Sequence, residues 1–97
     1  MDVRIQAIHF DATERLESFI NKKAERLARR NNTITAIDVN LRVVKPETAM
    51  NKEALIKVYT PGDPETVATK TADTFEEAVD LAIDALETQL ERAKEKK

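Results

Sequence analysis

The stretch Ile37-Asp38-Val39-Asn40-Leu41-Arg42-Val43 carries the clearest structural signal in this chain of 97 residues. Apolar and polar side chains alternate along it without a break. Successive side chains of a β-strand point to opposite faces of the sheet, so the alternation predicts a strand with one buried face. Pro46 has no amide proton to donate to a neighbouring strand and ends the pattern. The sequence therefore predicts a strand over residues 34–44.

A helix is expected before this strand, over residues 13–30. Asp11 or Thr13 can cap its first turn, and the Asn31-Asn32 pair favours a chain reversal at its end. Its apolar residues recur at three- and four-residue spacing and form one stripe: Leu16, Phe19, Ile20, Ala24 and Leu27. The stripe predicts a helix with one face against a core.

A further strand is expected upstream, over residues 2–8, where Val3, Ile5 and Ala7 alternate with polar residues. Downstream, residues 55–60 alternate in the same way. The β-branched residues of 66–71 predict a short fourth strand, and the run Pro61-Gly62-Asp63-Pro64 predicts a tight turn between these two strands.

A last helix is expected after Asp73 or Thr74, either of which can cap its first turn. Its apolar stripe ends before a tail rich in Lys and Glu. The stripe consists of Phe75, Val79, Ala82, Ile83, Leu86 and Leu90.

The predicted fold class is α+β, with the order β-α-β-β-β-α along the chain. Two amphipathic helices can cover one face of a four-stranded sheet and leave the other face open. If the first two strands are neighbours, the helical crossover makes them parallel and right-handed. The length suits a single domain spanning residues 1–97.

Composition excludes several classes of function. Cysteine is absent, which removes disulfides, thiolate metal sites and thiol nucleophiles. The N-terminus does not resemble a secretory signal, and no apolar run approaches the ~20 residues that span a bilayer. The sequence predicts a cytoplasmic protein without membrane contact.

Candidate chemical groups are few, and each has a simpler structural interpretation. His9 is the only histidine and is expected at a turn or on the surface. The lone Gly62 excludes a glycine-rich phosphate loop, and Ser18 lies within a helix instead of on a strained elbow. We therefore expect no catalytic residue, no metal, no cofactor and no small-molecule substrate.

Charge is segregated on the first helix although the net charge is −2. Placing residues ~100° apart puts Arg15, Lys22, Arg26 and Arg29 in one sector, with Lys23 and Arg30 at its border. The last helix carries acidic residues in one sector: Asp80, Asp84, Glu87 and Glu91. Either the cations bind a phosphate backbone or the two helices pair their charges as a solvated seam, and spacing alone leaves both open.

Several segments together resemble the ribosome hibernation promoting factor family, also called ribosome-associated inhibitor A and, by an older label, sigma-factor modulation protein. The resemblance begins with Val3-Arg4-Ile5 and Asp11-Ala12-Thr13-Glu14-Arg15-Leu16, continues through Lys22-Lys23 to Leu27, and includes the strand quoted first. It ends with the run from Phe75 to Leu86, Gln89-Leu90 and the Lys tail. It covers essentially the whole chain, and the fold of the family is β-α-β-β-β-α.

The resemblance implies a protein that binds the small ribosomal subunit between head and body and blocks translation in stationary or stressed cells. Its partner would be ribosomal RNA, with ribosomal proteins as further contacts, and no reaction is implied. The chain resembles a short form without the dimerisation domain, so a monomer or weak dimer is expected. The residues expected to contact RNA are Arg15, Lys22, Lys23, Arg26, Arg29, Arg30, Arg42, Arg92, Lys94, Lys96 and Lys97. The closing helix departs from the basic pattern of the family at Ala85, Glu87, Thr88 and Glu91.

Two other functions stay as alternatives. A protein-interaction module would use the open sheet face around Ile8, Leu55 and Tyr59, where an exposed apolar patch would favour it. A small enzyme would need a pocket with abnormally titrating carboxylates.

Overall fold

The computed structural model describes residues 2–8, 10–44, 49–62 and 65–95. Its elements follow the predicted order and confirm the predicted fold class. They are β1 (Asp2–Ala7), α1 (Glu14–Arg30), β2 (Ala36–Val43), β3 (Lys52–Tyr59), β4 (Thr66–Ala72) and α2 (Phe75–Glu95). Pro46 and Asp63-Pro64, where the sequence predicted a strand end and part of a turn, lie outside the described residues, as does His9.

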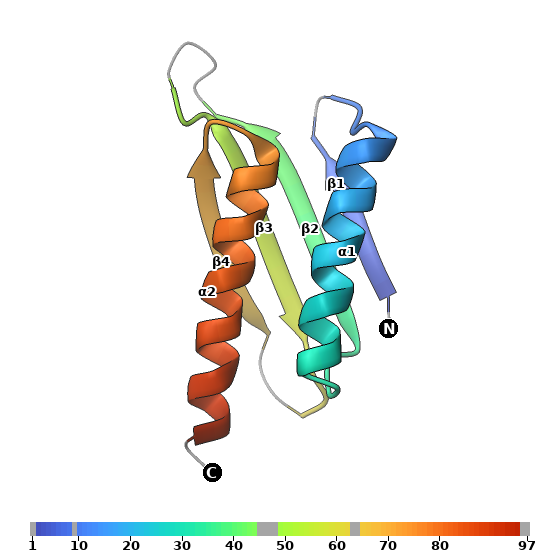
Figure 1. The fold of residues 1–97 in the computed structure, drawn as a ribbon, viewed down its shortest axis with the longest axis vertical. Helices are drawn as coiled ribbons and strands as arrows, with labels where there is room; N and C mark the ends of the chain where they lie inside the picture. The colour runs from blue at the N-terminus through green and yellow to red at the C-terminus, as the bar shows by residue number, and fades with distance from the viewer. Residues whose placement is uncertain (1, 9, 45–48, 63–64, 96–97) are drawn as a thin grey trace.

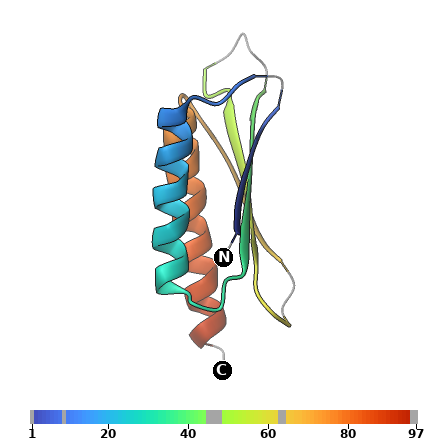
Figure 2. The same cartoon turned by 90° about the vertical axis from the view of Figure 1, so that its right-hand side faces the viewer.

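The four strands form one sheet in the order β1-β2-β3-β4 (Figure 1). β1 and β2 are parallel, with Ile5 opposite Val39, and the other neighbouring pairs are antiparallel. Both helices lie against one face of the sheet, and none of the described residues forms a helix over the other face (Figure 2). The helices lie side by side and run in the same direction, because each returns the chain to the same end of the sheet.

The core lies between the helices and the sheet. The inward side chains of the central strands are almost fully buried: Ile37, Val39 and Leu41 of β2, and Ala54, Ile56 and Val58 of β3. The helices contribute the predicted stripes: Leu16, Ile20, Ala24 and Leu27 of α1, and Val79, Ala82, Ile83 and Leu86 of α2. The flanking residues Phe19, Phe75 and Leu90 are partly buried and pack against this core.

Short side chains begin both helices, as the sequence predicted. Thr13 rather than Asp11 caps α1, since its hydroxyl accepts a hydrogen bond from the amide of Leu16 at 3.1 Å. Thr74 rather than Asp73 caps α2 and accepts from the amide of Glu77. These oxygens satisfy amides that have no partner within the helix.

α1 ends at the predicted chain reversal. Asn31 is buried, and its side-chain amide donates to the carbonyl of Leu27 at 3.1 Å. Its own carbonyl accepts from the amide of Ile34, which starts the turn into β2.

The predicted start of β3 was wrong. β3 begins at Lys52, three residues before the predicted start, because Lys52 and Glu53 pair with Val43 and Arg42 of β2 and also with β4. Pairing on both sides outweighs the low strand propensity of these residues. α2 continues past the apolar stripe to Glu95, through residues that are strong helix formers.

Candidate nucleic-acid interface

The exposed face of α1 carries a ridge of cations. Arg15, Lys22 and Arg26 are all exposed, and they fall within about 40° of one another around the helix. Within the described part of the chain, no hydrogen bond or ion pair involves these three side chains. We call these three residues the α1 ridge.

Arg29 lies next to the ridge and is loosely paired. Its guanidinium is 3.9 Å from the carboxylate of Glu25, one turn earlier on the same helix. Its side chain is 79% exposed, so this contact leaves most of the guanidinium in water. An exposed pair of this kind contributes little to stability.

Lys23 and Arg30, the border residues of the predicted stripe, lie in the seam between the helices. The ammonium of Lys23 is 2.7 Å from Asp80, and the guanidinium of Arg30 is 3.4 Å from Glu87. Lys23 Nζ also lies 5.5 Å from the ring centroid of Phe19, a cation–π contact. The predicted stripe therefore divides into an outward ridge and a seam paired with α2.

Arg42 lies on the other side of the molecule. It projects from β2 on the open sheet face, where its Nε donates to Glu53 at 2.6 Å and this hydrogen bond raises the pKa of Arg42. Arg42 alternates along β2 with the buried residues Ile37, Val39 and Leu41, so it lies on the face away from the helices. One flat partner surface therefore cannot contact both Arg42 and the α1 ridge.

The remaining predicted cations lie near the end of α2. Arg92 is exposed there. Lys94 lies in the last turn of that helix, and Lys96 and Lys97 lie outside the described residues.

The open sheet face holds a polar network that the sequence did not reveal. Arg4 Nε donates to Asp38 Oδ1 at 2.9 Å, and the hydroxyl of Tyr59 donates to Asp38 Oδ2 at 3.2 Å. The pKa of Tyr59 is raised, mainly by partial burial and secondly by the hydrogen bond to Asp38. The network depends on the register of three strands, which the sequence pattern does not give.

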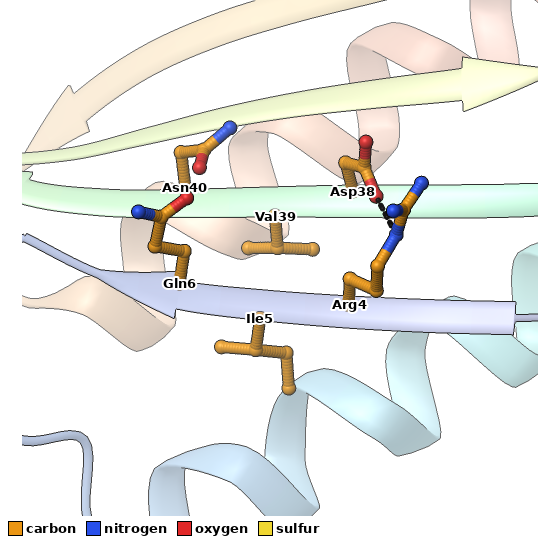
Figure 3. Close-up of a pocket in the computed structure, with 6 residues that line it drawn as sticks. All are labelled: Arg4, Ile5, Gln6, Asp38, Val39 and Asn40. Atoms are coloured by element: carbon orange, nitrogen blue, oxygen red, sulfur yellow. Dashed lines mark hydrogen bonds and ion pairs between the residues drawn. The ribbon is translucent and has the colours of Figure 1, made fainter.

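The network borders a surface hollow of about 450 Å³ between β1 and β2 (Figure 3). Its polar rim comes from Arg4 and Gln6 of one strand and Asp38 and Asn40 of the other. The Asp38 carboxylate is already engaged by Arg4 and Tyr59. No group of three or more His, Cys, Asp or Glu side chains among the described residues could hold a metal ion.

Among the described residues, apolar side chains do not form a continuous patch on the open face. Ile8 and Leu55 line a second hollow of about 290 Å³, but Asn40, Arg42, Glu53 and Thr69 complete its wall. Tyr59 is half-buried, and its hydroxyl is bonded to Asp38. The described residues of this face therefore form a mixed polar and apolar surface instead of the apolar patch that would favour the protein-interaction alternative.

Comparisons with known proteins agree with the fold. The family model described as Sigma 54 modulation protein / S30EA ribosomal protein matches residues 3–97. A ribosomal subunit interface protein from Coxiella burnetii has 26% identity and a TM-score of 0.85, with 97% of this chain and 98% of that chain covered. The N-terminal domain of Thermus thermophilus Protein Y has 25% identity and a TM-score of 0.79, with 95% and 98% covered. None of the curated proteins matches this chain significantly.

No helix in the described ranges is long and apolar enough to cross a membrane.

Proposed function

Since this chain belongs to the Sigma 54 modulation protein / S30EA ribosomal protein family, we propose that it associates with the ribosome by binding RNA of the small subunit. The outcome is inhibition of translation in stationary or stressed cells, in the cytoplasm and without a chemical reaction. The similarity to a ribosomal subunit interface protein supports ribosome association. We propose that residues 1–97 act as one binding domain, as a monomer or weak dimer.

The α1 ridge is the observation that carries this proposal. Phosphate contacts by Lys and Arg supply most of the sequence-independent affinity for nucleic acid, because each contact releases counterions. Arg15 and Arg26 are eleven residues apart, so the ridge extends over roughly 16 Å of helix at 1.5 Å per residue. That length lets three cations contact one phosphate strand that runs along the helix.

The decisive experiment is co-sedimentation with purified small subunits at rising salt. The test variant changes Arg15, Lys22 and Arg26 to Gln. Each lost phosphate contact lowers the salt slope of log K by about 0.7–0.9, so three lost contacts lower it by roughly 2–3. Wild-type binding that weakens with salt, together with a shallower slope in the variant, supports the α1 ridge as the RNA contact.

The matched control changes Lys52, Lys57 and Lys70 to Gln, which removes the same charge from β3 and β4. This variant should keep most of the wild-type salt slope. If the two triple variants lose the same affinity, net charge alone drives the binding. If the wild type does not sediment with ribosomes even at low salt, the proposed function is wrong.

A further inference from the structure

Two ion pairs join the helices in register. Lys23 and Arg30 are seven residues apart on α1, and their partners Asp80 and Glu87 are seven residues apart on α2. Parallel helices keep this spacing aligned, so the pairs form two rungs about 10 Å apart along the seam. The Asp80 side chain is 46% exposed and the Glu87 side chain 25% exposed, so both carboxylates reach the surface.

The seam lies directly beside the α1 ridge. Lys23 follows Lys22 in sequence, and Arg30 is one turn beyond Arg26 on the same side of the helix. Asp84 and Glu91, one turn beyond Asp80 and Glu87, are exposed and continue the acidic row on α2. A phosphate strand that contacts the ridge is therefore flanked by carboxylates, and two neighbouring cations are already paired.

Stability alone does not account for the seam. Pairs with this much exposure contribute little to the free energy of unfolding, because water screens them and side-chain order opposes them. The ion pairs have a larger effect on the affinity for a polyanion, because non-specific affinity depends on how many cations are available to phosphates. A charge that penalises incorrect partners increases specificity even when it lowers affinity.

We infer that Asp80 and Glu87 determine specificity for the ribosome over free RNA. They withhold Lys23 and Arg30 from phosphates and repel any strand that is not shaped to avoid them. Unstructured RNA can then contact only the α1 ridge, whereas a structured RNA surface of complementary shape keeps all its contacts with the protein. This inference rests on the proposed function and adds selectivity to the same interface.

The test variant combines Asp80→Asn with Glu87→Gln, which keeps side-chain shape and removes both carboxylates. The probes are poly-uridylate RNA and purified small subunits, each titrated at several salt concentrations. From the usual strength of exposed pairs, removing the two carboxylates should tighten poly-uridylate binding by roughly 2- to 30-fold. The salt slope should steepen by up to about 1.4, as expected for two added contacts to a single strand.

The selectivity ratio is the decisive quantity. Affinity for small subunits should rise less than affinity for poly-uridylate, so the ratio between them should fall. An unchanged ratio, or no gain in poly-uridylate binding by a variant with wild-type thermal unfolding, would overturn the inference and leave the proposed function intact.

The chain offers a matched control on the opposite face. Asp38→Asn with Glu53→Gln also raises the net charge by two, and it removes the carboxylate partners of two cations, Arg4 and Arg42. These cations lie on the open sheet face, away from the ridge. A gain in poly-uridylate binding equal to that of the seam variant would attribute the effect to net charge and overturn the inference. If wild-type protein binds no ribosomes, the proposed function and this inference fail together.

Discussion

The hydroxyl of Tyr59 donates a hydrogen bond to Asp38 across the β2–β3 ladder, with 3.2 Å between the two oxygens. Tyr59 lies opposite Ala36, so its ring reaches diagonally to the next outward position of β2. Arg4 of β1 binds the other oxygen of the same carboxylate. Three strands are thus linked by one carboxylate on the open face.

The pKa of Tyr59 should lie above its ordinary value in the folded protein, because partial burial and then the bond to Asp38 both disfavour the phenolate. Tyr59 is the only tyrosine and tryptophan is absent, so tyrosinate absorbance reports this group alone. The midpoint of the tyrosine titration should fall to its ordinary value when urea unfolds the protein. Asp38→Asn should lower the midpoint only partway, because burial is the larger cause of the raised pKa.

The same shift sets a dependence of stability on pH. A raised folded pKa contributes stability that is complete below the unfolded pKa and is lost as pH rises through the folded pKa. Urea unfolding should therefore show stability falling in the alkaline range, more steeply for wild type than for Asp38→Asn. Glu53→Gln, on the same face, should leave the tyrosine midpoint unchanged.

Thr13→Ala should destabilise the protein by about 0.5–2 kcal/mol, because the hydroxyl that caps the amide of Leu16 is lost. Thr13→Ser should retain most of this stability. Thr33→Ala is the control, since Thr33 is exposed and its hydroxyl has no bond among the described residues. Equal unfolding free energies for Thr13→Ala and Thr33→Ala would show that the cap is not needed.

Leu86→Ala should cost about 2–5 kcal/mol of unfolding free energy, because Leu86 is fully buried and its removal leaves a cavity beneath α2. Leu81 lies on the same helix but is 41% exposed, so Leu81→Ala should cost about 1 kcal/mol or less. Denaturant unfolding of both variants measures the difference. Similar losses would contradict the placement of the two leucines.

Met50→Gly should stabilise the protein by up to about 1 kcal/mol. Met50 has a φ of 55°, a left-handed conformation that is costly for a residue with a Cβ and ordinary for glycine. The amide of Met50 donates to Asp73 Oδ1 at 2.8 Å, and glycine keeps that donor. Met50→Ala is the control, because alanine keeps the backbone strain and should show no gain in stability. A loss of stability in the glycine variant would contradict this account.

The sequence predicts elements well where one periodic face is buried. The alternation of Ile37, Val39 and Leu41 located β2, and helical spacing located both stripes. It missed the start of β3, because Lys52 and Glu53 are held by pairing with two strands and not by their own propensity.

The candidate interface was only partly predictable for a similar reason. Helical spacing placed Lys23 and Arg30 at the border of the stripe, but their partners depend on the direction and offset of two helices. Arg42 was grouped with the helix cations by charge, although its alternation with Ile37, Val39 and Leu41 places it on the open sheet face, away from both helices. Arg4, Asp38 and Tyr59 become neighbours only once the strand register is fixed.

The spatial order of the strands is the same as their order along the chain, and this bears on how the protein folds. β2, β3 and β4 form a meander in which each strand meets its neighbour through a short connection, at low loop-closure cost. β1 pairs with β2 only after α1 has carried the chain back along the sheet. We therefore expect the meander to form first and β1 to join late, so that substitutions in β1 speed unfolding more than they slow folding.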